Sequence, residues 1–251
     1  MPKLVFLGTS NAVPDLQHEN THLALVAEKR LLLIDCANNP IVRLSQAGLN
    51  VHDLTDLLLT HFHPDHVSGV PSLLMSCWLL GRKKPLHIYG LQHTLERIEK
   101  IMDFYDWSTW PGFYQVEFHQ IVEQDLSLAL ANPDFRLFTS PVCHMLPCIG
   151  LRIEFPRSGQ VAAYSCDTEP CPQVIGLAAK ADILIHEATG AGLGHTSASQ
   201  AGEIARQAGA KALYLIHYPT GDFDPRPLVE QAKHTFPGPV TLAQDFMELT
   251  F

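Results

Sequence analysis

Short apolar runs separated by polar turns dominate the first part of the chain, which is typical of strands. The pattern predicts strands over Lys3–Leu7, His22–Val26, Leu31–Ile34 and Leu57–Leu59, with a helix over Ile41–Ala47 that Gly48 ends. The run Leu57–Leu59 is apolar at every position, so we expect this strand to be covered on both faces.

Helical and strand patterns then follow one another to the end of the chain. They predict helices over Pro71–Leu80, Gln92–Asp103, Ser199–Gln207 and Pro227–His234, and strands over Leu86–Tyr89, Ile183–Ile185, Ala212–Ile216 and near Phe246–Leu249, with further strands from Gln115 to Ala163. Strand-rich blocks that are each followed by helices indicate an α/β (α+β) fold in which two sheets pack together with helices outside.

The composition bounds the class of protein. The chain has 251 residues, 46% apolar and 17% charged, which suits one large domain or two closely packed halves. We expect one domain over residues 1–251. No window reaches the roughly 18 consecutive apolar residues of a membrane helix, and the stretch MPKLVFLGTSNAVP predicts a first strand rather than a signal peptide. We therefore expect a cytoplasmic protein without a membrane partner. Its six cysteines are too dilute for a disulfide scaffold, and its net charge of −9 argues against bulk electrostatic capture of nucleic acid.

The stretch 57-LLLTHFHPDHVSGV-70 gathers four metal-ligand side chains directly behind an apolar strand. His61 and His63 alternate on an extended segment, so both can face one cation, and Asp65 and His66 can turn toward a second position. Imidazole and carboxylate without thiolate suit zinc, manganese or iron. One tetrahedral cation cannot use four clustered ligands and still take more from elsewhere, which favours a two-metal site. The alternative is a run of solvated loop histidines.

Three further ligand-type residues end apolar or alternating runs later in the chain. His144 follows 135-FRLFTSPV-142, Asp167 ends 160-QVAAYSCD-167 and His217 ends 212-ALYLIH-217. One histidine after a strand is weak evidence, because satisfied structural histidines are common. Three such strand ends beside the first cluster predict that they complete the same metal centre.

The pattern T-H-F-H-P-D-H-x-x-G, with the later His, Asp and His, resembles the metallo-β-lactamase fold superfamily of dinuclear metal hydrolases over nearly the whole chain. The ribonuclease Z-like branch is indicated by Asn20 and by the segments 7-LGTSNAVP-14, 164-YSCDTEP-170, 182-DILIHEAT-189 and 194-GHTSASQAGEIARQAG-209. The resemblance implies a four-layer αββα sandwich of two mixed β-sheets with flanking helices.

The same resemblance implies a ligand set. By it, one metal would be held by His61, His63 and His144, the other by Asp65, His66 and His217, and Asp167 would bridge both. The cofactors are then two divalent ions, with zinc expected and manganese or iron as alternatives. A hydroxide between the ions would be the nucleophile. Asp65 would in addition orient the water or accept its proton.

His195 and Glu187 complete the expected catalytic residues. His195 precedes the capping box Ser197-x-x-Gln200, so it lies just before a helix begins. In ribonuclease Z-like enzymes the matching histidine stabilises the phosphate and protonates the leaving oxygen, and Glu187 would keep it oriented and charged. From the residues alone, His195 could equally be a ligand, a neighbour of the cap or a surface residue, and Glu187 a structural carboxylate. His186 is expected to be structural.

Two features depart from ribonuclease Z proper. That enzyme carries a long Gly- and Pro-containing arm that grips tRNA, expected between the His144 and Asp167 positions, but residues 145–166 predict only two strands with a turn at 157-RSG-159. In addition, 37-ANNPI-41 replaces the family's usual G-E-G-T-Q. The chemistry is retained, tRNA 3′ processing becomes an open question, and the expected substrate is a small phosphodiester or an RNA 3′ end.

The aromatic loop 104-FYDWSTWPGFY-114 admits three interpretations: the wall of a substrate pocket, a homodimer contact, or a small core of its own. The leading hypothesis for the whole chain is a metal-dependent, ribonuclease Z-like phosphodiesterase. The alternative is a hydrolase of aryl sulfates, lactones or thioesters on the same two metals. A non-catalytic metal-binding protein is the weaker alternative, because the seven expected ligand positions are all filled.

Overall fold

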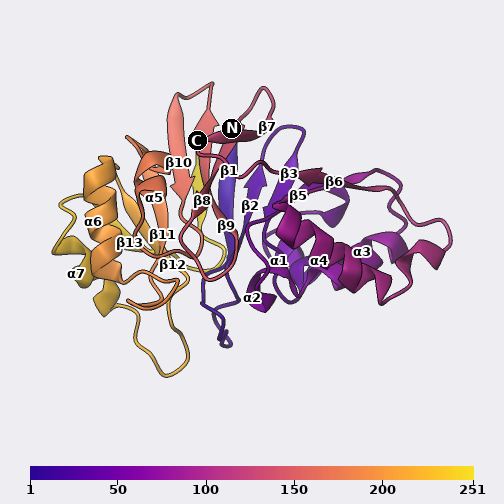
Figure 1. Cartoon of the computed structure of the whole chain (residues 1–251), viewed down its shortest axis with the longest axis horizontal. Coiled ribbons are helices and arrows are strands. Elements are labelled where there is room, and N and C mark those ends of the chain that lie inside the picture. The colour runs from indigo at the N-terminus through magenta and orange to yellow at the C-terminus, as the bar shows by residue number, and fades with distance from the viewer.

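Two seven-stranded sheets lie face to face at the centre of the computed structural model, which describes residues 1–251 (Figure 1). The first sheet has the order β14-β1-β2-β3-β4-β5-β6, and the second has the order β13-β12-β11-β10-β9-β8-β7. In each sheet the strands pair antiparallel from one edge to the middle and parallel from there to the other edge. Both sheets are therefore mixed, as predicted.

The strands of the first sheet are β1 (Lys3–Gly8), β2 (His22–Val26), β3 (Leu31–Ile34), β4 (Leu54–Leu59), β5 (Leu86–Gly90), β6 (Val116–Gln120) and β14 (Glu248–Thr250). The strands of the second sheet are β7 (Ser127–Ala131), β8 (Arg136–Val142), β9 (Cys148–Phe155), β10 (Gln160–Tyr164), β11 (Ile183–Glu187), β12 (Leu213–Ile216) and β13 (Val240–Leu242). The helices are α1 (Pro40–Gln46), α2 (Pro64–Val67), α3 (Val70–Leu79), α4 (Gln92–Asp103), α5 (Pro172–Leu177), α6 (Ala198–Ala208) and α7 (Pro227–Lys233).

Three apolar layers hold these elements together. The largest lies between the sheets and includes Phe6, Leu32 and Ile153. A second joins the first sheet to α1, α3 and α4, and a third joins the second sheet to α5, α6 and α7. In Figure 1 the first four helices gather on one side of the sheets and the last three on the other. The predicted four-layer αββα sandwich is confirmed.

Several local predictions are also confirmed. The strand before the histidine cluster, β4, is buried along nearly its whole length. The capping box at the start of α6 is formed, because the Ser197 side chain accepts from the Gln200 backbone N–H and the Gln200 side chain accepts from the Ser197 backbone N–H. All six cysteines are free, and all but Cys143 are buried. None of the helices has the length and apolarity needed to cross a membrane.

The sequence pattern missed three short elements. The single helical turn α2, the helix α5 and the three-residue strand β13 are too short to show a clear period. The last strand begins at Glu248 rather than near Phe246, because Phe246 has a left-handed backbone with φ of 67° and cannot continue a strand.

Candidate metal centre and active site

The predicted ligand residues meet at one edge of the two sheets, in loops that directly follow strands. The cluster that starts at His61 follows β4, whereas His144 follows β8, Asp167 follows β10 and His217 follows β12. Strands β8, β10 and β12 run in the same direction, so their carboxyl ends lie at the same edge. The fold thus brings together side chains that are far apart in the sequence.

Left-handed backbone conformations turn the chain sharply at this edge. Asp35 after β3 has φ of 62°, and both Cys166 after β10 and His217 after β12 have φ of 53°. Such conformations are costly for residues other than glycine, and they concentrate at functional sites. Here they aim side chains from three strand ends at one point.

The donor atoms form two groups that share one carboxylate. The first group consists of His61, His63, His144 and Asp167, and the second consists of Asp65, His66, His217 and Asp167. In the first, Nδ1 of His63 lies 3.0 Å from Nε2 of His61 and 3.1 Å from Nε2 of His144. In the second, Oδ2 of Asp167 lies 3.5 Å from Nε2 of His66 and 3.4 Å from Nε2 of His217. The two groups have the same composition as the two predicted ligand sets, and their role in binding metal stays a prediction.

Two observations test whether these residues suit metal ions. Ligand atoms around a tetrahedral zinc ion, with bonds of 2.0–2.1 Å, lie about 3.3–3.4 Å apart, close to the spacings within both groups. Nε2 of His66 and Oδ1 of Asp167 are buried polar atoms without a hydrogen-bond partner in the protein. A buried polar atom without a partner is unfavourable, and a cation is a partner that a ring nitrogen and a carboxylate oxygen would share. The donor set therefore fits a pair of divalent cations.

Hydrogen bonds behind the centre orient the imidazole rings of His66, His144 and His217. Nδ1–H of His66 donates to Asp35, and Nδ1–H of His144 donates to the carbonyl of Gly194. The Thr189 hydroxyl donates to the carbonyl of His217, so Nδ1–H of His217 donates to the Thr189 oxygen. In each ring the Nε2 lone pair is left to face the centre, as metal-binding histidines require.

Thr60 orients the ring of His61 in the same way. Its hydroxyl donates to Asp35, so its oxygen accepts from Nδ1–H of His61. Asp35 thus supports ligands of both groups, directly through His66 and indirectly through Thr60.

The electrostatics of the centre favour the ligand forms of two buried residues. Burial lowers the pKa of His61 well below its usual value, so this ring is neutral at pH 7. Burial opposes ionisation of Asp167, but attraction to the adjacent His217 and His66 rings, when these are protonated, holds its pKa well below the usual range. Neutral imidazole and ionised carboxylate are the forms that bind cations.

His195 lies beside both groups and is held by Glu187. Its ring centroid is 5.2 Å from that of His144 and 5.9 Å from that of His217. Its Nδ1–H donates to Oε1 of Glu187 over 3.0 Å. This hydrogen bond raises the pKa of His195, and burial raises the pKa of Glu187, so both shifts favour retention of a proton by the pair. Nε2 of His195 is left free for another partner.

An open cleft of about 300 Å³ covers this centre. Its lining includes His63, Asp65, Asp167, His195 and His217, together with Asn11, Ala12, Pro64, Met145 and Thr189. A substrate in the cleft can therefore reach both donor groups and His195 at once.

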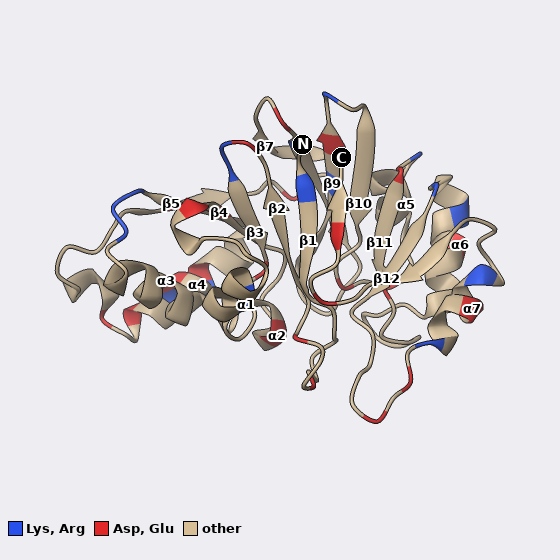
Figure 2. Cartoon of the chain, turned by 180° about the vertical axis from the view of Figure 1, so that it is seen from behind, with Lys and Arg blue, Asp and Glu red and all other residues tan.

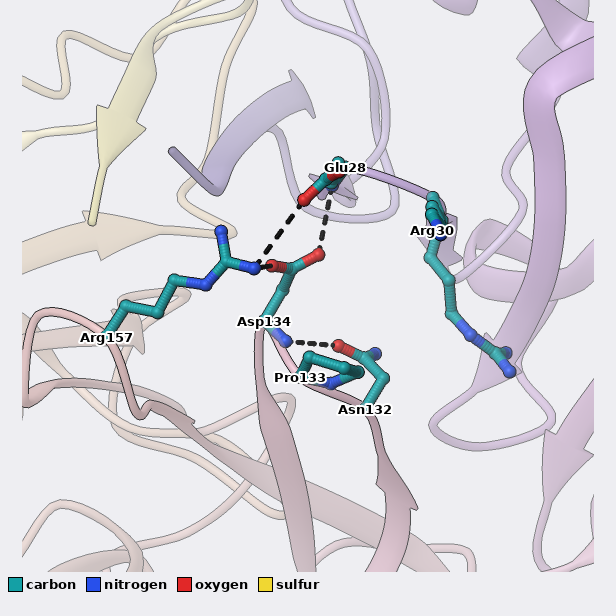
Figure 3. A pocket seen from close by; sticks show the side chains of 7 residues that line it. Glu28, Arg30, Asn132, Pro133, Asp134 and Arg157 are labelled. Carbon is teal, nitrogen blue, oxygen red and sulfur yellow. Dashed lines mark hydrogen bonds and ion pairs between the residues drawn. The ribbon is translucent and has the colours of Figure 1, made fainter.

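A larger hollow of about 580 Å³ lies at the opposite end of the strands, around the turns that precede β3 and β8 (Figure 3). Arg157 pairs there with Glu28 and Asp134, at 3.5 and 3.3 Å. Arg30 pairs with Asp56. Both guanidinium groups in this hollow are already engaged by carboxylates, and no metal-ligand group lines it.

Four supporting residues were not predicted: Asp35, Thr60, Thr189 and Gly194. Gly194 has φ of 77°, and a Cβ atom there would lie 2.8 Å from Nδ1 of His144. Only glycine therefore allows its carbonyl to approach this ring closely. Asp35 had a sequence signal, since it directly follows a buried strand as the predicted ligands do. Thr189 lies within the HEAT segment but carried no signal of its own.

The departures from ribonuclease Z proper have clear structural counterparts. The residues between His144 and Asp167 form the hairpin of β9 and β10 within the second sheet, so this part of the chain contains no arm. The segment 37–41 lies beside the end of the histidine cluster, since the backbone N–H of Asn38 donates to the hydroxyl oxygen of Ser68. Lysines and arginines are scattered among acidic residues over separate elements in Figure 2 and form no continuous basic track there.

The aromatic loop packs against α3 and the end of α4. The rings of Trp78 and Trp110 stack with centroids 5.0 Å apart, and Trp107, Trp110 and Phe113 pack against the core between the first sheet and its helices. Of the three interpretations, the structure favours a small core for these rings.

Known proteins of similar structure and sequence share this architecture. The metallo-β-lactamase fold protein YhfI from Bacillus subtilis superposes with a TM-score of 0.83 at 22% identity, covering 99% of this chain and 98% of that one. Human short-form tRNase Z superposes with a TM-score of 0.80 at 24% identity, covering 99% and 98%. Ribonuclease Z of Methanothermobacter thermautotrophicus is 29% identical over 94% of this chain and 93% of that protein.

The fold, the centre and the relatives together define the class of this protein. It is a metal-dependent hydrolase with the metallo-β-lactamase fold, similar to ribonuclease Z, and the predicted class is confirmed. Within that class, the chain belongs to the family described as anti-Pycsar protein Apyc1, which matches over residues 2–236.

Proposed function

We propose that this hydrolase is a phosphodiesterase that cleaves small phosphodiesters. One arrangement carries the proposal: His195, held by the buried Glu187, borders a cleft that is also lined by members of the two donor groups that share Asp167. Two cations and a proton donor on one cleft are what phosphodiester cleavage requires, because charge develops on both the phosphoryl group and the leaving oxygen. The cleft of about 300 Å³ and the short β9–β10 hairpin favour a small substrate. The similarity to ribonuclease Z supports RNA 3′ ends as the second candidate.

We propose zinc for both cations, because the donors are imidazole nitrogens and carboxylate oxygens at tetrahedral spacing. His61, His63 and His144 would hold one ion and Asp65, His66 and His217 the other, with Asp167 a member of both donor groups. When bound, two such cations supply Lewis-acid stabilisation of the phosphoryl oxygens and increase the acidity of water.

The protein's own groups move the protons. Asp65 lines the cleft, so its carboxylate can orient the attacking water and accept its proton. His195 donates a hydrogen bond from Nε2 to the phosphoryl group and then a proton to the leaving oxygen. Glu187 is a positioning residue that acts through His195: it fixes the ring and favours its charged form.

The decisive experiment measures turnover of bis-p-nitrophenyl phosphate by the zinc-loaded full chain, with p-nitrophenyl sulfate in parallel. We expect diester hydrolysis that a chelator abolishes and that His195→Ala reduces. His234→Ala is the matched control, since His234 is exposed at the end of α7 and belongs to no donor group. Absence of diester hydrolysis by protein that carries bound zinc would overturn the proposal. Sulfates, lactones and thioesters would then be the substrates to examine, and inactivity on all of them would indicate a non-catalytic protein.

A second measurement separates the two candidate substrates. Rates on a small cyclic or linear phosphodiester are compared with rates on precursor tRNA under the same conditions. A faster reaction with the small diester supports the proposal, whereas preferential cleavage of precursor tRNA would make RNA 3′ ends the substrate.

We also propose that the chain forms a homodimer through an exposed apolar surface that joins α3 to the first two residues of the aromatic loop. This surface is formed by Met75, Leu79, Leu80, Phe104 and Tyr105. Met75 and Tyr105 line the same shallow hollow, so the two segments are neighbours. Light scattering should find a dimer that Leu79→Arg dissociates, while Leu16→Arg, at an exposed leucine elsewhere, leaves it intact. A monomeric wild-type chain would contradict this proposal.

A further inference from the structure

A second set of metal-ligand side chains lies on the outer strands of the first sheet, away from the catalytic edge. It consists of His87 on β5 with Glu117 and His119 on β6. In the parallel pairing of these strands, His87 lies opposite Glu117, and Tyr89 lies opposite His119. Alternate residues of a strand share a face, so all three ligand side chains project from the same face of the sheet.

The three donor atoms form a compact triangle. Nδ1 of His87 lies 3.0 Å from Nε2 of His119 and 3.2 Å from Oε2 of Glu117, and the remaining side, Nε2 of His119 to Oε2 of Glu117, is 3.7 Å. Three ligands of a tetrahedral zinc ion lie about 3.3–3.4 Å apart, and the sides of this triangle scatter around that value. Two histidines and a glutamate are also a ligand set that zinc uses elsewhere.

The surroundings hold this triangle in place and leave it accessible. The Tyr89 ring stacks on the His119 ring, with centroids 4.7 Å apart and planes 18° from parallel. The three ligand side chains are 31–40% exposed, so solvent can reach the ion and supply a fourth ligand. The neighbouring carboxylate of Asp56, opposite His87 on β4, is buried and already paired with Arg30, so the set has three members.

The position of the triangle suggests what an ion would do there. Strand β6 is the edge of its sheet and pairs only with β5. An edge strand has a neighbour on one side only and exposes unpaired backbone groups on the other. An ion that binds one residue of β5 and two of β6 would cross-link the two strands.

We propose that His87, Glu117 and His119 form a separate binding site for a divalent transition metal, with zinc as the ion, that fastens β6 to β5. The site is independent of the catalytic centre, because the two share no residue. Its occupancy stabilises the edge of the first sheet and leaves the hydrolytic chemistry unchanged.

The test compares metal content and stability among four forms of the full chain: wild type, His119→Gln, Glu117→Gln and the control His52→Gln. His52 is exposed and belongs to no donor group, so the control removes an ordinary surface histidine. Each protein is stripped of metal, loaded with Zn²⁺, desalted and analysed by elemental mass spectrometry, and its melting temperature is recorded with and without Zn²⁺.

We expect His119→Gln and Glu117→Gln to retain about one zinc ion fewer per chain than wild type and the His52→Gln control. Both should lose part of the zinc-dependent rise in melting temperature, because binding to the folded state alone stabilises it. Their hydrolysis of bis-p-nitrophenyl phosphate should match wild type. Equal zinc content in all four proteins, or an equal zinc-dependent rise, would overturn the proposal. Using two independent ligand variants keeps the test valid if one of them folds poorly.

Discussion

Nδ1 of His195 and Oε1 of Glu187 lie 3.0 Å apart, and the same carboxylate oxygen also accepts from the backbone N–H groups of Thr168 and Thr196. The other oxygen, Oε2, accepts from the backbone N–H of Thr189. Glu187 is fully buried at the end of β11, whereas His195 is half-buried at the cleft. A carboxylate that three backbone groups fix in place can hold an imidazole ring in one orientation. The buried carboxylate therefore keeps His195 in a fixed orientation at the cleft, although His195 lies in a glycine-rich segment.

The first prediction concerns the leaving group. If His195 protonates the leaving oxygen, its removal should matter most where that oxygen is strongly basic. We expect His195→Ala to lower kcat about 10²–10⁴-fold for a diester with an alkoxide leaving group, the usual range for general acid catalysis. For bis-p-nitrophenyl phosphate the loss should be about tenfold, because p-nitrophenolate leaves readily without a proton. Steady-state kinetics on both substrates check this, and equal losses would contradict a role as the acid.

The second prediction concerns Glu187. In Glu187→Gln an NH₂ group replaces one carboxylate oxygen and faces backbone N–H groups that donated to that oxygen. At least one backbone N–H then has no acceptor, which costs about 1–3 kcal/mol of stability. The neutral side chain also orients His195 less firmly, so kcat should fall about tenfold with little change in KM.

A double-mutant cycle separates positioning from general damage to the fold. If Glu187 acts only through His195, the double variant Glu187→Gln/His195→Ala should be no slower than His195→Ala alone. Additive losses would show that Glu187 acts on catalysis by another route. Melting temperatures of all three variants give the structural cost independently.

The sequence contained most of the information about the layout of the centre. The spacing of His61, His63, Asp65 and His66 is local, and a strand that ends there presents them together. His144, Asp167 and His217 were found because each ends an apolar run, and strands of one direction bring such ends to the same edge. Division of these residues into two groups sharing Asp167 followed from the family resemblance, and the observed donor groups have the same composition. Their role as ligands stays a prediction.

The supporting contacts could not be predicted because they depend on precise tertiary distances. Nothing local indicates that Asp35 reaches His66, or that the carbonyl of Gly194 accepts from His144. The turn α2 was missed because a single turn shows no helical period, although it sets the directions of Asp65 and His66. The triangle of His87, Glu117 and His119 was missed because it requires the register of β5 against β6.

The third prediction concerns Asp35, which accepts from Nδ1–H of His66 and from the backbone and hydroxyl of Thr60. Supporting carboxylates of this kind usually contribute 10–100-fold to metal affinity, so we expect Asp35→Asn to weaken zinc binding at the centre by about that factor. Asparagine tolerates the left-handed backbone at this position, so the fold should persist. Competition with a chromophoric chelator measures the affinity. Asp53→Asn, at an exposed aspartate, is the control, and an affinity equal to that of this control would refute the role of Asp35.

The fourth prediction concerns the dependence of stability on pH, through a histidine outside the donor groups. His186 is fully buried on β11, its Nδ1–H donates to the carbonyl of Glu187, and its Nε2 has no partner. Burial lowers the pKa of His186 to about 4, whereas an unfolded chain has a histidine pKa of about 6.5. Between these values the unfolded state binds a proton that the folded state does not. Stability is therefore unaffected above pH 6.5 and falls as the pH drops toward 4, by about 3 kcal/mol in total for this residue.

The variant His186→Asn isolates this contribution, because asparagine keeps a donor near the position of Nδ1 but does not titrate. Urea unfolding of metal-free protein is measured at several pH values from 7 to about 4.5, spanning the range in which the unfolded histidine gains its proton. The variant should be less stable than wild type at pH 7, because a smaller side chain leaves a cavity. The difference should shrink as the pH falls, since only wild type carries the acid penalty of His186. Other histidines titrate alike in both proteins and cancel in the comparison. Parallel stability curves for the two proteins would show that His186 is not buried in its neutral form.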